Sequence, residues 1–178
     1  MDVHPKARRA LRSLDEAALQ ELALKYVGRF ATSRAKLCSY LKRKVRERGW
    51  DGRCEPDLDG LAQRLAERGY IDDSAYALAK SQALTGRGYG RRRVEEKLRF
   101  AGISEEDGRA ARELAEREAI AAALRFAERR RIGPFGLEIR DSKQREKAIG
   151  AMVRAGHPLA LARAIASLAP GASLDLDN

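Results

Sequence analysis

Few residues of this 178-residue chain have the types and spacing that catalysis needs. Its two histidines are His4, close to the N-terminus, and His157, which follows a glycine at an expected helix end. They suggest neither a catalytic triad nor a metal cluster. Cys38 and Cys54 are too few and too widely spaced for a recognisable metal motif, and we interpret both as reduced thiols. The sequence therefore predicts a protein that is not an enzyme and that needs no cofactor or metal.

Two further patterns resemble sites but have simpler structural interpretations. Asp72 and Asp73 form a carboxylate pair at an expected helix start, where Asp accepts hydrogen bonds from unpaired backbone N–H groups. Residues 86–90, Gly-Arg-Gly-Tyr-Gly, look like a phosphate loop. No strand precedes them, however, and their spacing fits neither the dinucleotide-binding nor the P-loop pattern. We interpret the aspartates as capping residues and the glycines as a break between helices.

Basic residues carry more information, and the first group lies in the segment 33–48. Lys42/Arg46 and Lys44/Arg48 are like-charged pairs four residues apart, which cost roughly 0.2–0.5 kcal/mol each in an isolated helix. A merely solvated helix face has mixed signs instead, as the segment 112–117 does. A self-repelling face favours an anionic partner. The charged residues of segment 33–48 are Arg34, Lys36, Lys42, Arg43, Lys44, Arg46, Arg48 and the single acid Glu47.

A second basic group opens the segment 89–101 with three consecutive arginines, 91–93. Cations at a helix start oppose the helix dipole at a cost of about 0.3–1 kcal/mol each. We expect Glu95 and Glu96 to pair with the first two arginines, which leaves residues 87, 93 and 97 as the freer cations. Tyr89 could stack on a base or anchor the helix start, and both interpretations stay open. The candidate partner-binding and nucleic-acid-binding residues are Lys42, Arg43, Lys44, Arg46, Arg87, Tyr89, Arg91, Arg92, Arg93 and Lys97.

These residues must be positioned by helices that stop at regularly spaced glycines. Gly49, Gly102 and Gly156 recur at an interval of about 53 residues, and each follows apolar residues spaced four apart. The pattern predicts Schellman stops, in which the residue after the glycine packs on the residue four before it. Gly69 is a fourth instance. The expected contacts are Trp50 on Val45, Tyr70 on Leu65, Ile103 on Leu98 and His157 on Met152.

A period near fifty is also typical of β-propeller blades, but the linking segments lack strand alternation and are rich in Ala, Leu, Arg and Glu. We therefore predict an all-α protein, an elongated array of tandem three-helix repeats. The expected division is a basic N-terminal arm (1–13), repeat 1 (14–69), repeat 2 (70–116), repeat 3 (117–170) and an acidic tail (171–178). Five of the expected helices span 15–30, 33–48, 58–68, 73–84 and 89–101. Further helices are expected to start at 104 and at 141 or 142, and the final one to run from 158 to before 170.

The first helix has a clear start, whereas the helix from Ser104 has no clear end. Ser13 and Glu16 form a potential capping box for the first helix. The helix from Ser104 has no clear end before Arg131, and the sequence does not decide whether it breaks near Arg117 or continues.

The formal net charge of +10 points to an anionic partner such as nucleic acid, a membrane surface or a nucleoprotein. Membrane is the weakest of these, because no apolar run is long enough to span a bilayer and residues 1–20 lack the apolar core of a signal peptide. We expect a cytoplasmic monomer.

The central part of the chain resembles the signature of the RecX family of regulatory proteins. The resemblance covers Gly69-Tyr70-Ile71-Asp72-Asp73, then Tyr76-Ala77, Gly86, Gly88, Arg92, Val94, Leu98 and Gly102-Ile103. Residues 23–41 and 154–157 resemble the outer repeats of the same family. The chain departs from the family in an extra helical turn before Gly49, and in His157 where an aromatic residue is usual.

This resemblance implies a non-enzymatic modulator of the RecA recombinase that lies in the groove of the RecA–DNA filament. Family members restrain filament assembly, ATP hydrolysis, strand exchange and co-protease activity, which places them in DNA repair, recombination and the SOS response. The implied partners are the RecA filament and single- and double-stranded DNA. An alternative is a helical DNA-binding transcriptional repressor with a helix-turn-helix between residues 58 and 84, although this segment lacks a basic, polar recognition helix.

Overall fold

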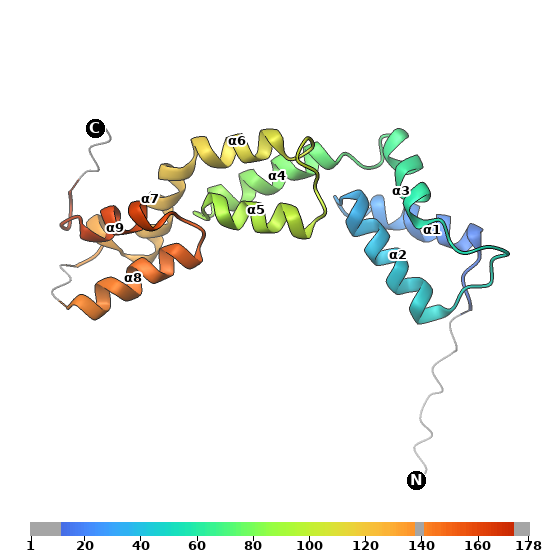
Figure 1. Cartoon of the computed structure of the whole chain (residues 1–178), viewed down its shortest axis with the longest axis horizontal. Coiled ribbons are helices and arrows are strands. Elements are labelled where there is room, and N and C mark those ends of the chain that lie inside the picture. Colours follow the sequence, from blue (N-terminus) through green and yellow to red (C-terminus); the bar gives the residue numbers. More distant parts are fainter. Residues whose placement is uncertain (1–11, 138–140, 173–178) are drawn as a thin grey trace, which may run out of the picture. The chain divides into compact units, whose positions relative to one another are not determined.

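The computed structural model describes residues 12–137 and 141–172. Within these residues the chain is all-helical and has no strand, which confirms the predicted fold class (Figure 1). Most of the expected basic arm, including His4, and most of the acidic tail lie outside the described residues. The helices are α1 (Glu16–Val27), α2 (Arg34–Arg48), α3 (Leu58–Glu67), α4 (Asp73–Gly86), α5 (Arg91–Phe100), α6 (Arg109–Arg117), α7 (Ala119–Arg130), α8 (Ser142–Arg154) and α9 (Leu159–Ser167), with a 3-10 turn η1 (Gly133–Phe135).

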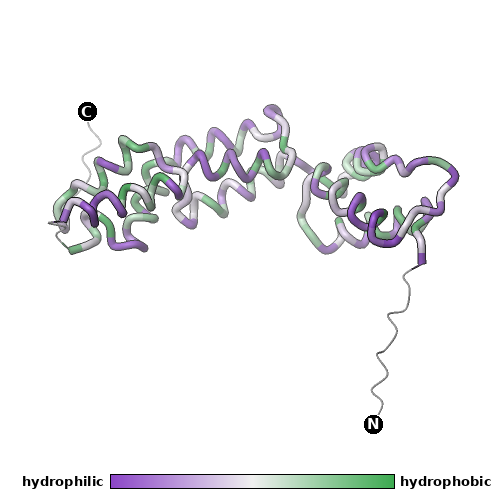
Figure 2. The backbone as a smooth tube through the Cα atoms, turned by 60° about the horizontal axis from the view of Figure 1, so that its bottom comes forward, coloured by the Kyte–Doolittle hydropathy of each residue, from purple (hydrophilic) through white to green (hydrophobic). Residues whose placement is uncertain are grey.

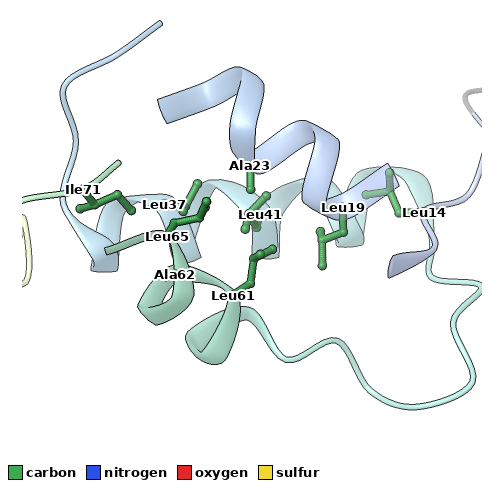
Figure 3. Close-up of a cluster of buried hydrophobic side chains, with 9 residues drawn as sticks. All are labelled: Leu14, Leu19, Ala23, Leu37, Leu41, Leu61, Ala62, Leu65 and Ile71. Carbon is green, nitrogen blue, oxygen red and sulfur yellow. The ribbon is translucent and has the colours of Figure 1, made fainter. Parts of the chain in front are cut away.

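The chain divides into two compact units, Met1–Asp72 and Asp73–Asn178. In the first unit, α1, α2 and α3 enclose one hydrophobic cluster, and Figure 3 shows its leucines pointing into the space between these helices. Leu37 and Leu41 of α2 are completely buried because their spacing of four keeps them on one helix face. The opposite side of α2 is therefore left to its cations.

The second unit contains two hydrophobic clusters. One lies among α4, α5 and α6, and the other among α7, α8 and α9. Tyr89 is partly buried and packs against both. Figure 2 shows hydrophobic and hydrophilic residues alternating along these helices, as expected for amphipathic helices that each bury one face. Separate clusters in consecutive helix triplets are consistent with tandem repeats, and the boundaries 14–69, 70–116 and 117–170 stay a proposal.

Three of the four predicted helix stops have the backbone hydrogen bonds of a Schellman motif. At Gly156, the amide of His157 donates to the carbonyl of Met152 over 3.2 Å, and the Gly156 amide donates to Val153 over 3.0 Å. Gly69 and Gly102 make the equivalent pairs of bonds, and all three glycines have positive φ. The residues after these glycines differ in burial, since Tyr70 is 55% exposed while His157 is completely buried.

The stop at Gly49 is different. The Gly49 amide donates to the Val45 carbonyl over 2.8 Å, but Gly49 has a ψ of 163°, so the chain leaves the helix extended. Trp50 then forms a parallel bridge with Leu14, in which the Leu14 amide donates to the Gly49 carbonyl and its carbonyl accepts from Asp51. Pairing with the segment before α1 replaces the expected Schellman stop here.

Two expected helix starts also change. Asp15, rather than Ser13, caps α1 by accepting a 2.8 Å hydrogen bond from the Ala18 amide, so the predicted capping box is wrong. Ser104 accepts from the Asp107 amide over 3.0 Å and organises only a turn, and α6 begins at Arg109. The undecided helix breaks at Glu118, between α6 and α7.

Candidate nucleic-acid interface

The first basic surface is the exposed side of α2. Ser33 caps this helix by accepting a 3.2 Å hydrogen bond from the Lys36 amide. The single acid, Glu47, lies 2.6 Å from Lys44 and 3.6 Å from Arg43, and these neighbouring cations lower its pKa, with the Lys44 hydrogen bond as the main cause. Both cations also lie within 6 Å of the Tyr40 ring. Two of the four predicted binding residues on α2 are thus partly neutralised.

The remaining two, Lys42 and Arg46, have no ion-pair partner among the residues that the structure describes. They line an open groove between α2 and the segment 55–59, whose other wall carries Glu55 and Asp57. Lys42 and Arg46 are therefore the α2 cations that an anionic ligand could engage without first displacing an ion pair.

On α5 the ion pairs differ from those expected. Arg91 pairs with Glu116 of α6 at 2.6 Å, and Arg93, not Arg92, pairs with Glu96 at 2.7 Å. Glu95 reaches across to α6 instead. Arg93 is consequently not one of the freer cations. In the described part of the chain, Arg92, Lys97 and Arg99 have no ion-pair partner.

The partner of Glu95 is Arg112, and this contact is structural. Arg112 donates two hydrogen bonds to the Glu95 carboxylate, at 2.7 and 3.4 Å, and two more to the carbonyls of Ser104 and Glu105. Its side chain is 18% exposed. The Arg112 hydrogen bond lowers the pKa of Glu95, and the Glu95 carboxylate raises the pKa of Arg112. The mixed charges of α6 thus hold α5, α6 and their connecting turn together.

The C-terminus of α8 lies against the N-terminus of α5. The Gly90 and Arg92 amides donate to the carbonyls of Ala155 and Gly156, at 3.0 and 3.2 Å. No side chain caps α5, because these carbonyls take that place. The negative end of the α8 dipole therefore offsets the cost of three arginines at the start of α5.

The same junction forms a shallow groove with cations on both sides. Arg92 and Arg99 line it from α5, and Arg154, in the last turn of α8, lines it from the opposite side. Five arginines from the two helices line this groove, at positions 91–93, 99 and 154, together with Glu95 and Glu96. A phosphate backbone is the kind of ligand that such a groove suits.

The predicted residues just before α5 have mainly structural positions. Tyr89 packs into both clusters of its unit, and its amide donates to the Leu84 carbonyl over 3.0 Å, which favours the interpretation as an anchor. The guanidinium of Arg87 lies 5.5 Å from the Tyr89 ring centroid, and its carbonyl accepts from Arg129.

Phe100, at the end of α5, is the feature that the sequence prediction missed. Its side chain is 85% exposed, next to Arg99. The signal was present in the sequence, since Phe100 falls eight residues after Arg92 and six after buried Val94, off the apolar stripe of the helix.

The residues considered for catalysis have structural surroundings. His157 is completely buried, packs against Phe126 at a centroid distance of 5.7 Å, and places Nε2 3.0 Å from the Gly88 carbonyl oxygen. Cys38 is half-buried, and burial is the main cause that raises its pKa to about 12. Asp73 is the buried first residue of α4. Among the described residues no group of His, Cys, Asp and Glu could hold a metal ion, and no helix there is long and apolar enough to cross a bilayer.

These features define a class of protein: an all-α molecule made of consecutive helix triplets, with uncompensated cations on the exposed sides of two helices. No protein-family model matches the chain. The chain is 27% identical over 165 residues to the protein named Regulatory protein RecX from Myxococcus xanthus (strain DK1622), with 86% of this chain and 87% of the relative covered. Its structure matches the crystal structure of RecX from Lactobacillus salivarius with a TM-score of 0.57 at 16% identity, covering 84% of this chain and 92% of the other.

The bacterial relative, the fold and the motif around Gly69–Ile103 agree. The chain is thus similar to RecX proteins in sequence and in fold.

Proposed function

We propose that this protein is a non-enzymatic regulator that binds the RecA–DNA filament and restrains RecA activity. The restrained activities are ATP hydrolysis, strand exchange and co-protease function in recombination and the SOS response to DNA damage. The observation that carries the proposal is the family relationship combined with cations left uncompensated on α2 and α5. We propose that the protein acts in the cytoplasm as a monomer, without a cofactor.

The basic helices suit a partner that combines protein and nucleic acid. Lys42 and Arg46 on α2, and Arg92, Lys97 and Arg99 on α5, can contact phosphates without first breaking an ion pair. Such contacts release condensed counterions and so favour binding to both single- and double-stranded DNA in a salt-dependent way. The paired cations Arg43, Lys44, Arg91 and Arg93 stay in the proposed interface, where a phosphate would compete with Glu47, Glu116 or Glu96.

The test is DNA-dependent ATP hydrolysis by RecA of the same organism. The wild-type protein should slow hydrolysis, and reversing Arg92 and Lys97 to Glu should raise the concentration needed for inhibition. Arg117→Glu is the matched control, because Arg117 is an exposed arginine on α6 and belongs to neither basic helix. Wild-type inhibition by a folded double variant would refute the assignment of α5, and no effect of the unmodified protein would refute the function.

The alternative function, a helix-turn-helix repressor, is disfavoured by the fold. Its two helices would be α3 and α4, but these belong to different compact units. The apolar faces of α3 and α4 are buried in separate clusters, Leu61 and Leu65 in one and Ala77 and Leu84 in the other. A helix-turn-helix needs the two helices to share one packing core.

A further inference from the structure

Phe100 is exposed in a way that folding does not explain. Among the described residues it is the most exposed aromatic side chain, at 85%, and its ring lies at the end of a well-packed helix whose Val94 and Leu98 are buried. An aromatic ring left in water gives up burial worth on the order of 1.5–3 kcal/mol. Single exposed apolar residues are common on protein surfaces, so the neighbours of this ring decide whether it suits a partner.

The side of α5 that carries Phe100 also carries two arginines and one glutamate. On a helix of 100° per residue, Arg92, Arg99 and Phe100 lie on one side of α5, opposite the buried stripe. Glu96 shares this side but is paired with Arg93, and Glu95 is paired with Arg112. Arg92 and Phe100 are separated by about 12 Å along the helix axis, room for a few nucleotides.

These neighbours discriminate between kinds of partner. A protein-docking surface normally surrounds its aromatic anchor with other apolar side chains. Phe100 is the only large hydrophobic residue of α5 that is exposed, and the charged residues around it are Arg92, Arg99 and Glu96, of which Glu96 is paired with Arg93. A single ring beside a line of cations is instead the arrangement that binds unpaired bases, because the ring stacks on a base while the cations contact phosphates.

We propose that Phe100 is a stacking platform for an unpaired base of a single-stranded nucleic acid whose phosphates lie along Arg92 and Arg99. The inference rests on the proposed function in assigning α5 to the nucleic-acid interface, and adds the form of nucleic acid that this helix recognises. A duplex keeps its bases stacked on one another, so Phe100 should contribute to single-strand binding and not to duplex binding.

The test measures binding of the full-length protein to labelled oligonucleotides by fluorescence anisotropy, without RecA. Phe100→Ala should weaken binding to a mixed-sequence single strand by about tenfold, within the range that loss of one stacked base produces. Phe100→Trp should restore binding. A single strand of the same length with abasic sites should bind the wild type and Phe100→Ala equally, and so should a duplex.

Salt dependence separates the ring from the cations. Phe100→Ala should leave the slope of log K against log salt unchanged. Arg92→Gln and Arg99→Gln should each reduce the slope by about 0.7, because each variant binds one phosphate fewer. Leu137→Ala is the matched control, because Leu137 is 90% exposed but is not on α5. Since Phe100 is exposed, its truncation should not change the thermal unfolding temperature.

Three outcomes would overturn the proposal. Phe100→Ala could keep both wild-type affinity for the single strand and wild-type inhibition of RecA, it could lose as much affinity on the abasic strand, or it could keep wild-type affinity for the single strand but no longer inhibit RecA. The last would identify Phe100 as a contact to protein. Loss of single-strand binding by Phe100→Ala, together with a wild-type protein that does not affect RecA, would refute the proposed function and leave the stacking role standing.

Discussion

Gly90 and Gly156, which belong to different helix triplets, are in backbone contact. A Cβ atom on Gly90 would lie 2.4 Å from the Gly156 carbonyl oxygen, and one on Gly156 would lie 2.5 Å from the Arg93 nitrogen. Neither position has room for a side chain. The close approach lets the C-terminal carbonyls of α8 cap α5, so the junction sets both the position and the electrostatic environment of the α5 arginines.

Gly156→Ala should therefore destabilise the second unit strongly. Gly156 has a φ of +100°, whose left-handed conformation costs an L-residue roughly 1–2 kcal/mol. The clash with the Arg93 backbone adds about 1–3 kcal/mol, as overpacking does. Urea unfolding followed by circular dichroism measures the decrease in stability. Gly86→Ala is the control in the same unit, because nothing lies within 4 Å of the added Cβ, and it should leave stability unchanged or raise it.

Arg131→Gly should have the opposite effect and stabilise the protein. Among the described residues Arg131 is the only non-glycine with positive φ, at 54°, and it ends α7 with the Ile132 amide donating to the Ala127 carbonyl. Glycine adopts this conformation without the steric penalty of Cβ, so we expect a gain of up to about 1 kcal/mol. Thermal unfolding tests it, and a lower unfolding temperature would show that the Arg131 side chain contributes more than the strain costs.

His157 should make stability depend on pH near neutrality. Because a carbonyl oxygen only accepts, Nε2 carries the proton donated to Gly88, and Nδ1 is buried with no hydrogen-bond partner in the described structure. Burial lowers the pKa of His157 below its ordinary value of 6.5. The unfolded chain thus takes up this proton first as pH falls, so the stability is fully present above about pH 6.5 and is lost below it, by up to about 1.4 kcal/mol per pH unit.

His157→Phe should flatten this dependence below about pH 6.5, while lowering stability at neutral pH by about 1–3 kcal/mol because the Gly88 carbonyl loses its donor. His4→Gln is the control and should keep the wild-type slope. A wild-type slope in His157→Phe would mean that other groups cause the acid sensitivity. The carboxylates with lowered pKa, including Glu95 and Glu96, lose their contribution only at lower pH, below about 4.5.

Arg112→Ala should destabilise the α4–α6 triplet. The substitution leaves Glu95 and two carbonyls in the turn without their donor, and a hydrogen bond to a charged group contributes about 1.5–3 kcal/mol. Arg117→Ala, on the exposed side of α6, should change stability by less than about 0.5 kcal/mol. If the two variants were equally stable in urea, the hydrogen bonds of Arg112 would contribute nothing measurable.

The sequence by itself predicted most of the helices, because apolar spacing and stop glycines are local signals, but it left open the break between α6 and α7. Leu37, Leu41, Val94 and Leu98 are buried as their spacing predicts, and three of the four predicted stops form Schellman motifs. The sequence also showed which segments are basic, since charge is read directly from composition.

Tertiary structure decided which charges pair and which aromatic residues stay exposed. The partners of Arg91 and Glu95 lie 25 and 17 residues away on α6, a choice that spacing within one helix cannot predict. Trp50 pairs with the Leu14 backbone instead of forming a Schellman stop. Tyr89 is partly buried, while Phe100 is exposed to solvent. Local spacing fixes which face of a helix is apolar, but only packing between helices decides which polar groups meet, because ion pairs and ring contacts depend on distances between segments far apart in the chain.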